Sequence, residues 1–126
     1  AYVDRQAGFS LKDAIGLIHN SGGLSFLAHP FLYDCDIDKL VADFEHLDGD
    51  GIETYYDYIT NRPEKFIKPA QNSEMIAHAQ ALAMLSGMLQ SGGSDFHGEN
   101  KKQTLGRFSA PNALLSKMKE ALGKPL

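Results

Sequence analysis

Residues 90–98 read QSGGSDFHG, and this stretch decides how the rest of the chain is interpreted. It places a carboxylate, Asp95, two residues before an imidazole, His97, in a setting rich in glycine. Residues two apart on an extended chain point the same way, so an Asp-x-His at the end of a strand can aim both side chains into one cavity. Glycine lets the backbone pass close to an ion or a substrate. The stretch therefore predicts a pair of metal ligands where a strand ends.

Short apolar runs of strand length alternate with helical patterns along the chain. The predicted strands cover residues 24–28, 52–56 and 87–91. The predicted helices cover residues 11–20, 37–47, 63–85 and 111–122. Alternation of this kind indicates an α/β fold with parallel strands and right-handed crossovers. Residues 1–9 show no sustained period and are predicted to be a lead-in segment.

Polar caps and prolines predict where the helices begin. Ser10 followed by Asp13 resembles a helix N-terminus in which the serine accepts from a free backbone N–H. The helical region 63–85 is expected to break or kink at Pro69, with Ser73 as the cap where it restarts. The other two starts are predicted at a cap on Asp36 or Asp38 and at Pro111.

Polar residues follow each predicted strand, and parallel strands of one sheet all end on the same side. His29 follows the first strand, Asp57 the second, and the Asp95/His97 pair the third. In α/β folds the active site lies at this edge. Zinc, manganese and iron take imidazole and carboxylate ligands, so His29, Asp95 and His97 are predicted to form a three-ligand site. The alternative is that Asp95 caps a turn and His97 is an ordinary loop histidine.

Several further residues are candidates for the same edge. Glu53 lies inside the second strand, where an active-site role and a hydrogen-bonded structural role are both open. Tyr55 and Tyr56 could stack on a substrate, although aromatic residues in strands more often serve packing. Arg107 is a candidate for contacting a phosphate. The polar segment 99–104 is expected to be an exposed loop near the mouth of the site.

Composition limits the classes of partner. Twelve basic and sixteen acidic side chains give a net charge of −4, so no overall positive field indicates a nucleic-acid or membrane surface. Metal ions can supply local positive charge, which leaves a small phosphorylated substrate, or a nucleic acid as substrate, open. The single cysteine cannot form an internal disulfide, and no stretch approaches the roughly 20 apolar residues of a membrane span. A soluble, cytoplasmic protein is expected.

Three segments in this order resemble the C-terminal half of the PHP (polymerase and histidinol phosphatase) family, and most closely its stand-alone metal-dependent phosphoesterases. They are residues 22–30 (GGLSFLAHP), residues 50–56 (DGIETYY) and residues 92–98 (GGSDFHG), followed by Leu105-Gly106. The resemblance implies a distorted seven-stranded (β/α) barrel. It also implies two or three divalent metal ions at the carboxyl ends of the strands, with Mn, Zn, Fe and Mg all open as their identity.

The resemblance also implies residue roles. His29 matches the histidine ligand of the family's Ala-His-Pro motif, and Asp95 and His97 match its closing Asp-x-His ligands. The family opens with a His-x-His pair, which this sequence lacks. Residues 1–126 are therefore expected to be the C-terminal portion of such a domain, without the N-terminal half of the barrel. An unpaired strand edge would then invite oligomerisation.

The expected function is hydrolysis of a phosphate ester, such as a nucleotide or another small phosphorylated metabolite, with metal held by His29, Asp95 and His97. Arg107 and Glu53 are the expected substrate contacts. The isolated chain is expected to bind metal weakly and to turn over little or no substrate. Two other classes stay open: a non-catalytic structural or interaction module of the same fold, and a metal-dependent amidohydrolase-like enzyme that acts on carbon–nitrogen bonds.

Overall fold

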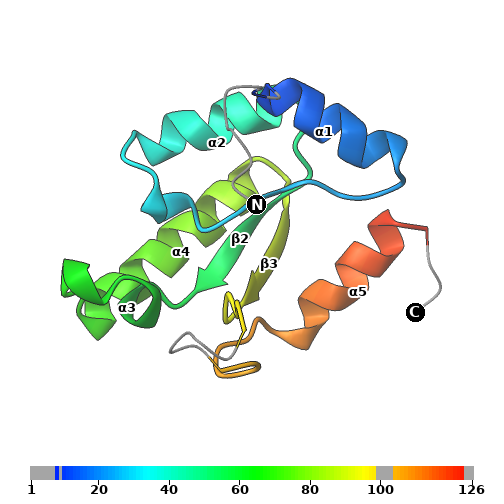
Figure 1. The fold of residues 1–126 in the computed structure, drawn as a ribbon. Coiled ribbons are helices and arrows are strands. Elements are labelled where there is room, and N and C mark those ends of the chain that lie inside the picture. Colours follow the sequence, from blue (N-terminus) through cyan, green and yellow to red (C-terminus); the bar gives the residue numbers. More distant parts are fainter. Residues whose placement is uncertain (1–7, 9, 99–103, 124–126) are drawn as a thin grey trace.

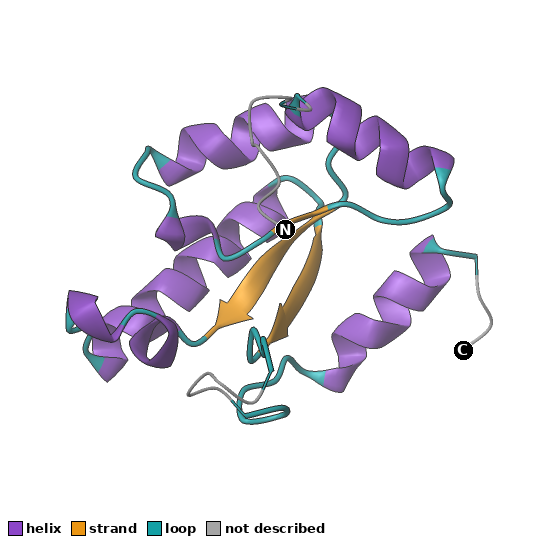
Figure 2. Ribbon diagram, viewed as in Figure 1, coloured by secondary structure: helices purple, strands orange, loops and turns teal. Residues whose placement is uncertain are grey.

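The computed structural model describes residues 8, 10–98 and 104–123. Their centre is a parallel sheet with the strand order β1-β2-β3, formed by β1 (Phe26–Leu27), β2 (Gly51–Tyr56) and β3 (Leu89–Gly93). The arrowheads of β2 and β3 point to the same end of the molecule (Figure 2). The prediction of an α/β fold with parallel strands is confirmed. The predicted lead-in segment lies outside the described residues except for Gly8, and so does the loop 99–104 except for Thr104.

Helices and short turns connect and cover the strands. In chain order they are α1 (Leu11–Asn20), the 3₁₀ turn η1 (Pro30–Leu32), α2 (Ile37–His46), α3 (Tyr58–Asn61), the 3₁₀ turn η2 (Pro63–Lys65), α4 (Pro69–Leu85) and α5 (Asn112–Ala121). Helix α4 packs against β2, and α5 lies beside β3 (Figure 1). In the described part of the chain, no helix combines the length and apolar character that crossing a membrane requires.

The first two helices begin where the sequence predicts. Ser10 Oγ accepts from the Asp13 N–H at 3.1 Å, while the Asp13 carboxylate accepts from the Ser10 N–H at 3.3 Å, a reciprocal capping box. Asp36, one of the two predicted caps, accepts from the Lys39 N–H at 3.2 Å and begins α2. Each cap satisfies a backbone donor that has no partner within the helix.

The predicted helical region 63–85 breaks at Pro69, as expected, but its first part is not an α-helix. Residues 63–65 form the turn η2, and α4 begins at Pro69 because a first helical position needs no N–H. The short helix α3, just before this region, was not predicted. Ser73 is not a cap: its hydroxyl donates to the Pro69 carbonyl at 3.1 Å from inside the helix. Asp57 begins α3 by accepting from the Thr60 N–H at 3.1 Å.

Other boundaries differ by one to two residues. β1 is shorter than predicted because the Ser25 N–H donates to the Asp50 carboxylate at 2.6 Å rather than to a neighbouring strand. β3 begins at Leu89, after a turn in which Gly87 has φ 65°. Helix α5 begins one residue later than predicted, at Asn112, with Pro111 in the cap position.

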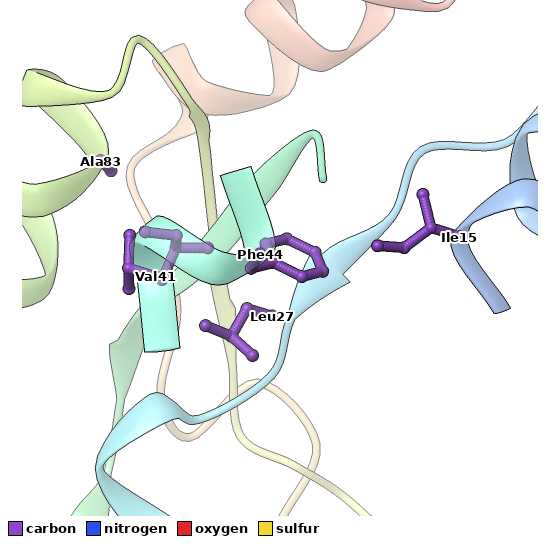
Figure 3. Packing of buried hydrophobic residues seen from close by; sticks show 6 residues of the cluster. Ile15, Leu27, Val41, Phe44 and Ala83 are labelled. Atoms are coloured by element: carbon purple, nitrogen blue, oxygen red, sulfur yellow. The ribbon is translucent and has the colours of Figure 1, made fainter. Parts of the chain in front are cut away.

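The core lies between the sheet and the helices α1, α2 and α4. Its buried members are Ile15 of α1, Leu27 of β1, Val41 and Phe44 of α2, Ile52 of β2 and Ala83 of α4. Figure 3 labels five of these side chains, which come from separate segments of the chain: Ile15, Leu27, Val41, Phe44 and Ala83. Full burial of an aliphatic or aromatic side chain stabilises a fold by about 1.5–3 kcal/mol. This packing fixes the strands whose ends carry the candidate site.

The register of β2 on β3 contains one irregularity. Glu53 pairs with Ser91, but the next pair joins Tyr55 to Gly92, so Thr54 is an extra residue on β2. Bulges of this kind redirect the side chains that follow them and are common next to active sites. Here the bulge sets the direction of Tyr56, the last residue of β2.

Candidate metal site at the carboxyl ends of the strands

Four polar side chains from all three strand units meet at the carboxyl end of the sheet. His29 follows β1, Glu53 and Tyr56 belong to β2, and Asp95 follows β3. The His29 N–H donates to Glu53 Oε2 at 2.8 Å, and the Tyr56 hydroxyl donates to Asp95 Oδ2 at 2.9 Å. The rings of His29 and Tyr56 lie 5.3 Å apart between centroids. The prediction that His29 and Asp95 share one edge agrees with this geometry.

His29 has an unusual backbone and an unsatisfied ring nitrogen. Its φ of 32° and ψ of 63° lie in the left-handed region, which costs a non-glycine residue about 1–3 kcal/mol. Among the described residues, the buried Nδ1 of His29 has no hydrogen-bond partner. Buried polar atoms are normally paired, so a lone nitrogen at a strand end is a position where a ligand can act as the missing partner.

Asp95 shares the left-handed backbone. Its φ is 54°, and Asp tolerates this conformation better than most residues. One carboxylate oxygen accepts from Tyr56, and the other lies 3.4 Å from Nδ1 of His97. Burial, followed by the contact with Asp95, raises the pKa of the Tyr56 phenol far above its usual range. Tyr56 therefore stays protonated and acts as a fixed hydrogen-bond donor to the carboxylate.

His97 is the most exposed of the three predicted ligands. Its Nδ1 lies 2.6 Å from the backbone carbonyl of Asp95, and its side chain is 53% exposed. A carbonyl oxygen can only accept, so Nδ1 carries the proton and Nε2 keeps the lone pair in the neutral ring. A histidine that bonds a carbonyl through one nitrogen is oriented to bind a metal through the other.

Glu53 lies beneath His29. Burial raises the pKa of its carboxyl, the hydrogen bond from the His29 N–H acts in the opposite direction, and the charge of Asp95 raises it further. Of the two roles open from the sequence, the structure shows a hydrogen-bonded one, because the carboxylate holds the His29 backbone. Direct contact between Glu53 and a substrate stays a prediction.

The three predicted ligands lie less close together in the structure than the sequence predicted. In the part of the chain that the structure describes, no three His, Cys, Asp or Glu side chains lie close enough together to hold a metal ion. Asp95 meets His97 directly, whereas Tyr56 links it to His29: the Tyr56 hydroxyl bonds Asp95, and the Tyr56 ring lies 5.3 Å from the His29 ring. Imidazole and carboxylate groups are suitable ligands for a divalent ion such as zinc or manganese. The buried Nδ1 of His29, which has no hydrogen-bond partner among the described residues, is an atom that such an ion could bind. The role of His29, Asp95 and His97 as ligands stays a prediction.

The remaining predicted residues lie apart from this network. Arg107 lies in the turn 104–107, where its N–H donates to the Thr104 carbonyl at 3.2 Å, and its side chain is exposed. Asp57, expected at the same edge, is used as the cap of α3. Its carboxylate is therefore engaged with the backbone.

Tyr56 is one of two strand tyrosines for which stacking on a substrate and packing were both considered. It is 1% exposed, so packing is confirmed, but its hydroxyl also donates a hydrogen bond to Asp95.

Asn72 of α4 stabilises the same region: its side-chain oxygen accepts from the Tyr58 N–H at 2.8 Å, and its amide donates to the Tyr56 carbonyl at 3.5 Å. Asn72 was not predicted. An asparagine on the apolar face of α4 was the only signal that could have identified it.

Comparisons with known proteins agree with the phosphoesterase interpretation. A 3',5'-nucleoside bisphosphate phosphatase of Chromobacterium violaceum is 36% identical over 100 residues, which are 76% of this chain and 30% of that protein. A protein of Bifidobacterium adolescentis assigned as a metal-dependent phosphoesterase superposes with a TM-score of 0.68 at 20% identity, over 93% of this chain and 38% of that one. No protein-family model matches the chain. The chain thus has the fold of part of the B. adolescentis structure and spans about a third of either relative.

Proposed function

We propose that this chain is the C-terminal portion of a PHP-type, metal-dependent phosphoesterase. The observation that carries the proposal is the pair His29 and Asp95, two non-glycine residues with left-handed backbones. They follow β1 and β3, the strands on either side of β2, and each is bonded to a residue of β2, Glu53 or Tyr56. Strained backbone of this kind clusters at active sites. The similarity to a phosphatase and to an assigned phosphoesterase supports the same chemistry.

His29, Asp95 and His97 are proposed to hold divalent metal, with Mn, Zn, Fe and Mg as candidates. When bound, the metal polarises phosphoryl oxygens and lowers the pKa of a water that attacks phosphorus. Tyr56 bonds one oxygen of Asp95, and the other oxygen, 3.4 Å from Nδ1 of His97, is the proposed ligand atom. Glu53 fixes the backbone of His29, and the Asp95 carbonyl fixes the proton of His97 on Nδ1.

The proposed substrate is a small phosphorylated molecule, with a nucleoside bisphosphate as the first candidate because the C. violaceum relative is named for that substrate. A nucleic-acid substrate is not part of the proposal. Arg107 and Glu53 remain proposed substrate contacts, and the cytoplasm is the proposed location. Further ligands would come from the rest of the barrel, so the chain alone is proposed to bind metal weakly.

The edges of the described sheet suggest an oligomer or a strand partner. β1 and β3 each pair on one side only within the described residues, and an open edge can pair with another chain. Light scattering at high concentration tests this point. A dimer or larger species is expected, and a monomeric mass would contradict the proposal.

The experiment that tests the function measures release of inorganic phosphate from adenosine 3',5'-bisphosphate and 4-nitrophenyl phosphate in the presence of Mn²⁺ or Zn²⁺. It uses the natural protein that contains this chain. Asp95→Asn and His97→Gln are expected to lower kcat at least about 100-fold. His46→Gln is the control, because His46 lies at the end of α2 that leads into the amino end of β2. Its activity should match the wild type.

Two results would overturn the proposal. If no phosphate ester is turned over but ammonia or an amine is released from amide substrates, the amidohydrolase alternative replaces it. If neither reaction occurs and Mn²⁺ does not bind to the intact protein, the structural or interaction module replaces it.

A further inference from the structure

A hollow of about 360 Å³ includes in its lining Tyr33, whose ring neighbours His29 of the candidate metal site. It is built from three segments: the residues after β1, the turn η2 after β2, and the first turns of α4. The first two follow strands at their carboxyl ends, which places the hollow on the same side of the sheet as His29 and Asp95. Its volume falls within the range of sites that bind small organic molecules, about 300–1,000 Å³.

Tyr33 connects the hollow with the candidate metal site. Its ring lies 6.1 Å from the ring of His29, with an interplanar angle of 30°, and it also lines the hollow. Only the ring of Tyr33 would therefore separate a molecule in the hollow from the ring of His29. This adjacency is what the organic part of a phosphate ester needs when its phosphate is at the metal.

The apolar wall of the hollow is held in place by neighbouring rings. Phe31 packs edge-on against Tyr58, with centroids 5.8 Å apart and planes at 89°, and its N–H lies 3.4 Å from the Tyr58 hydroxyl. Its other side meets His78 at 5.6 Å. With Leu32, this wall is a preformed surface that an aromatic or aliphatic body can cover without ordering it first.

The lining of the hollow also carries charge. Arg62 and Lys65 both line the hollow, and Asp34 is the acidic residue of the lining. Nη1 of Arg62 contacts Glu64 at 3.3 Å in an exposed ion pair, and such pairs contribute little. Arg62 can therefore exchange that contact for a bidentate one to a bound anion. Asp34 can accept a hydrogen bond from a hydroxyl or amino group of the same molecule.

We infer that this hollow is the subsite for the organic body of the substrate: an apolar ring lies against Phe31 and Leu32, and a second anionic group binds Arg62 and Lys65. The inference rests on the proposed function, since it assigns the phosphate that is cleaved to the neighbouring metal site. A substrate with two negatively charged groups joined by a nucleoside-sized body fits both sites together. A monoester without a second charge would use only one of them.

Binding without metal tests the subsite independently of catalysis. The protein is titrated in EDTA with adenosine 5'-monophosphate and with adenosine, and binding is followed by NMR chemical shifts. The difference between the two affinities gives the contribution of the phosphate charge to binding, and adenosine alone gives that of the ring. In the double variant Arg62→Gln/Lys65→Gln, the affinity for the monophosphate is expected to fall about tenfold and that for adenosine less than twofold. Lys117→Gln on α5 is the matched control and should change neither. Circular dichroism verifies that the variants are folded.

Turnover gives the second readout. In the active protein, the double variant should raise KM for adenosine 3',5'-bisphosphate about tenfold while kcat stays within twofold, and 4-nitrophenyl phosphate should be unaffected. Equal binding of the monophosphate by variant and wild type, or an equal loss for monophosphate and adenosine, would overturn the inference. Charge-dependent binding in a protein that releases no phosphate would support the subsite and reject the phosphoesterase function instead.

Discussion

The backbone N–H of His29 and the carboxylate of Glu53 are joined by a hydrogen bond of 2.8 Å between neighbouring strand units. This bond explains how His29 holds a left-handed backbone, because it satisfies the N–H at a position where Pro30 prevents the next residue from donating. The side chain of Glu53 thus replaces the ladder bond that β1 would otherwise make.

Replacing Glu53 by alanine and by glutamine should separate its roles. Glutamine keeps an acceptor for the His29 N–H, whereas alanine leaves the N–H without one, so Glu53→Ala is expected to be less stable than Glu53→Gln by about 1–3 kcal/mol. Urea denaturation at pH 7 measures this difference, and amide hydrogen exchange at His29 should be faster in the alanine variant. Glu45→Ala, at an exposed position of α2, is the control for loss of a carboxylate. Equal stability of the two Glu53 variants would show that the bond does not hold His29.

Removal of the Tyr56 hydroxyl should leave the Asp95 carboxylate without the hydrogen bond that positions it. Phenylalanine keeps the buried ring, so Tyr56→Phe tests only the 2.9 Å bond to the carboxylate, and a loss of about 1.5 kcal/mol in the free energy of unfolding is expected. If Asp95 holds metal as proposed, Mn²⁺ affinity should also fall about tenfold. Isothermal titration measures the affinity. Tyr55→Phe on the same strand is the matched control, and an equal effect in both variants would reject a specific role for Tyr56.

The sequence predicted the order of elements better than their ends. The helix pattern from Leu11 and the cap at Ser10 were correct because amphipathic periodicity and capping are local properties. Helix α3 was missed because its four residues are too few to show a helical period. The shortening of β1 was also not predictable, since it depends on Asp50, which lies 25 residues from Ser25 in the chain.

The sequence indicated that the candidate residues lie at one edge of the sheet, but not their geometry there. The motif residues Asp95 and His97 and the alternation of elements were sufficient to place His29 near Asp95. Nothing local in the sequence indicates that His29 and Asp95 have positive φ, because tertiary hydrogen bonds impose that conformation. The bulge at Thr54, which directs Tyr56 toward Asp95, depends likewise on pairing with a distant strand.

Acid should destabilise the fold through Asp50. Burial alone would raise the pKa of its carboxyl, but hydrogen bonds from Ser25 and His19 together lower it below its usual range. The folded state therefore binds this proton less readily than the unfolded chain. The resulting stability is fully present above the unfolded pKa of about 3.9 and is lost as the pH falls through the lower folded value.

Asp50→Asn should remove that dependence. At pH 7 the variant is expected to lose about 1–3 kcal/mol, because a charged acceptor of three hydrogen bonds becomes neutral. Between pH 5 and pH 2 its free energy of unfolding should decline less steeply than that of the wild type, as measured by urea denaturation at each pH. Glu74→Gln, at an exposed position of α4, is expected to follow the wild-type curve. Parallel curves for Asp50→Asn and the wild type would contradict the role given to Asp50.

Two adjacent glycines of β3 should respond differently to the same substitution. A Cβ at Gly92 would lie 2.4 Å from both Cβ and the carbonyl oxygen of Tyr55, whereas a Cβ at Gly93 would meet nothing within 4 Å in the described structure. Gly92→Ala therefore forces the paired backbones apart at the bulge and is expected to cost about 3 kcal/mol. Gly93→Ala should change stability by less than about 1 kcal/mol, since it also restricts the unfolded chain.

Gly92→Ala should also affect the candidate site, because Gly92 lies in β3, three residues before Asp95. Separation of β3 from β2 at this point would move the Asp95 carboxylate away from the Tyr56 hydroxyl and weaken Mn²⁺ binding along with the fold. Urea denaturation and metal titration of both alanine variants measure the two effects. If Gly93→Ala were as damaging as Gly92→Ala, flexibility of the glycine pair would be the requirement. Damage confined to Gly92→Ala would establish that the close approach of β3 to Tyr55 positions the ligand.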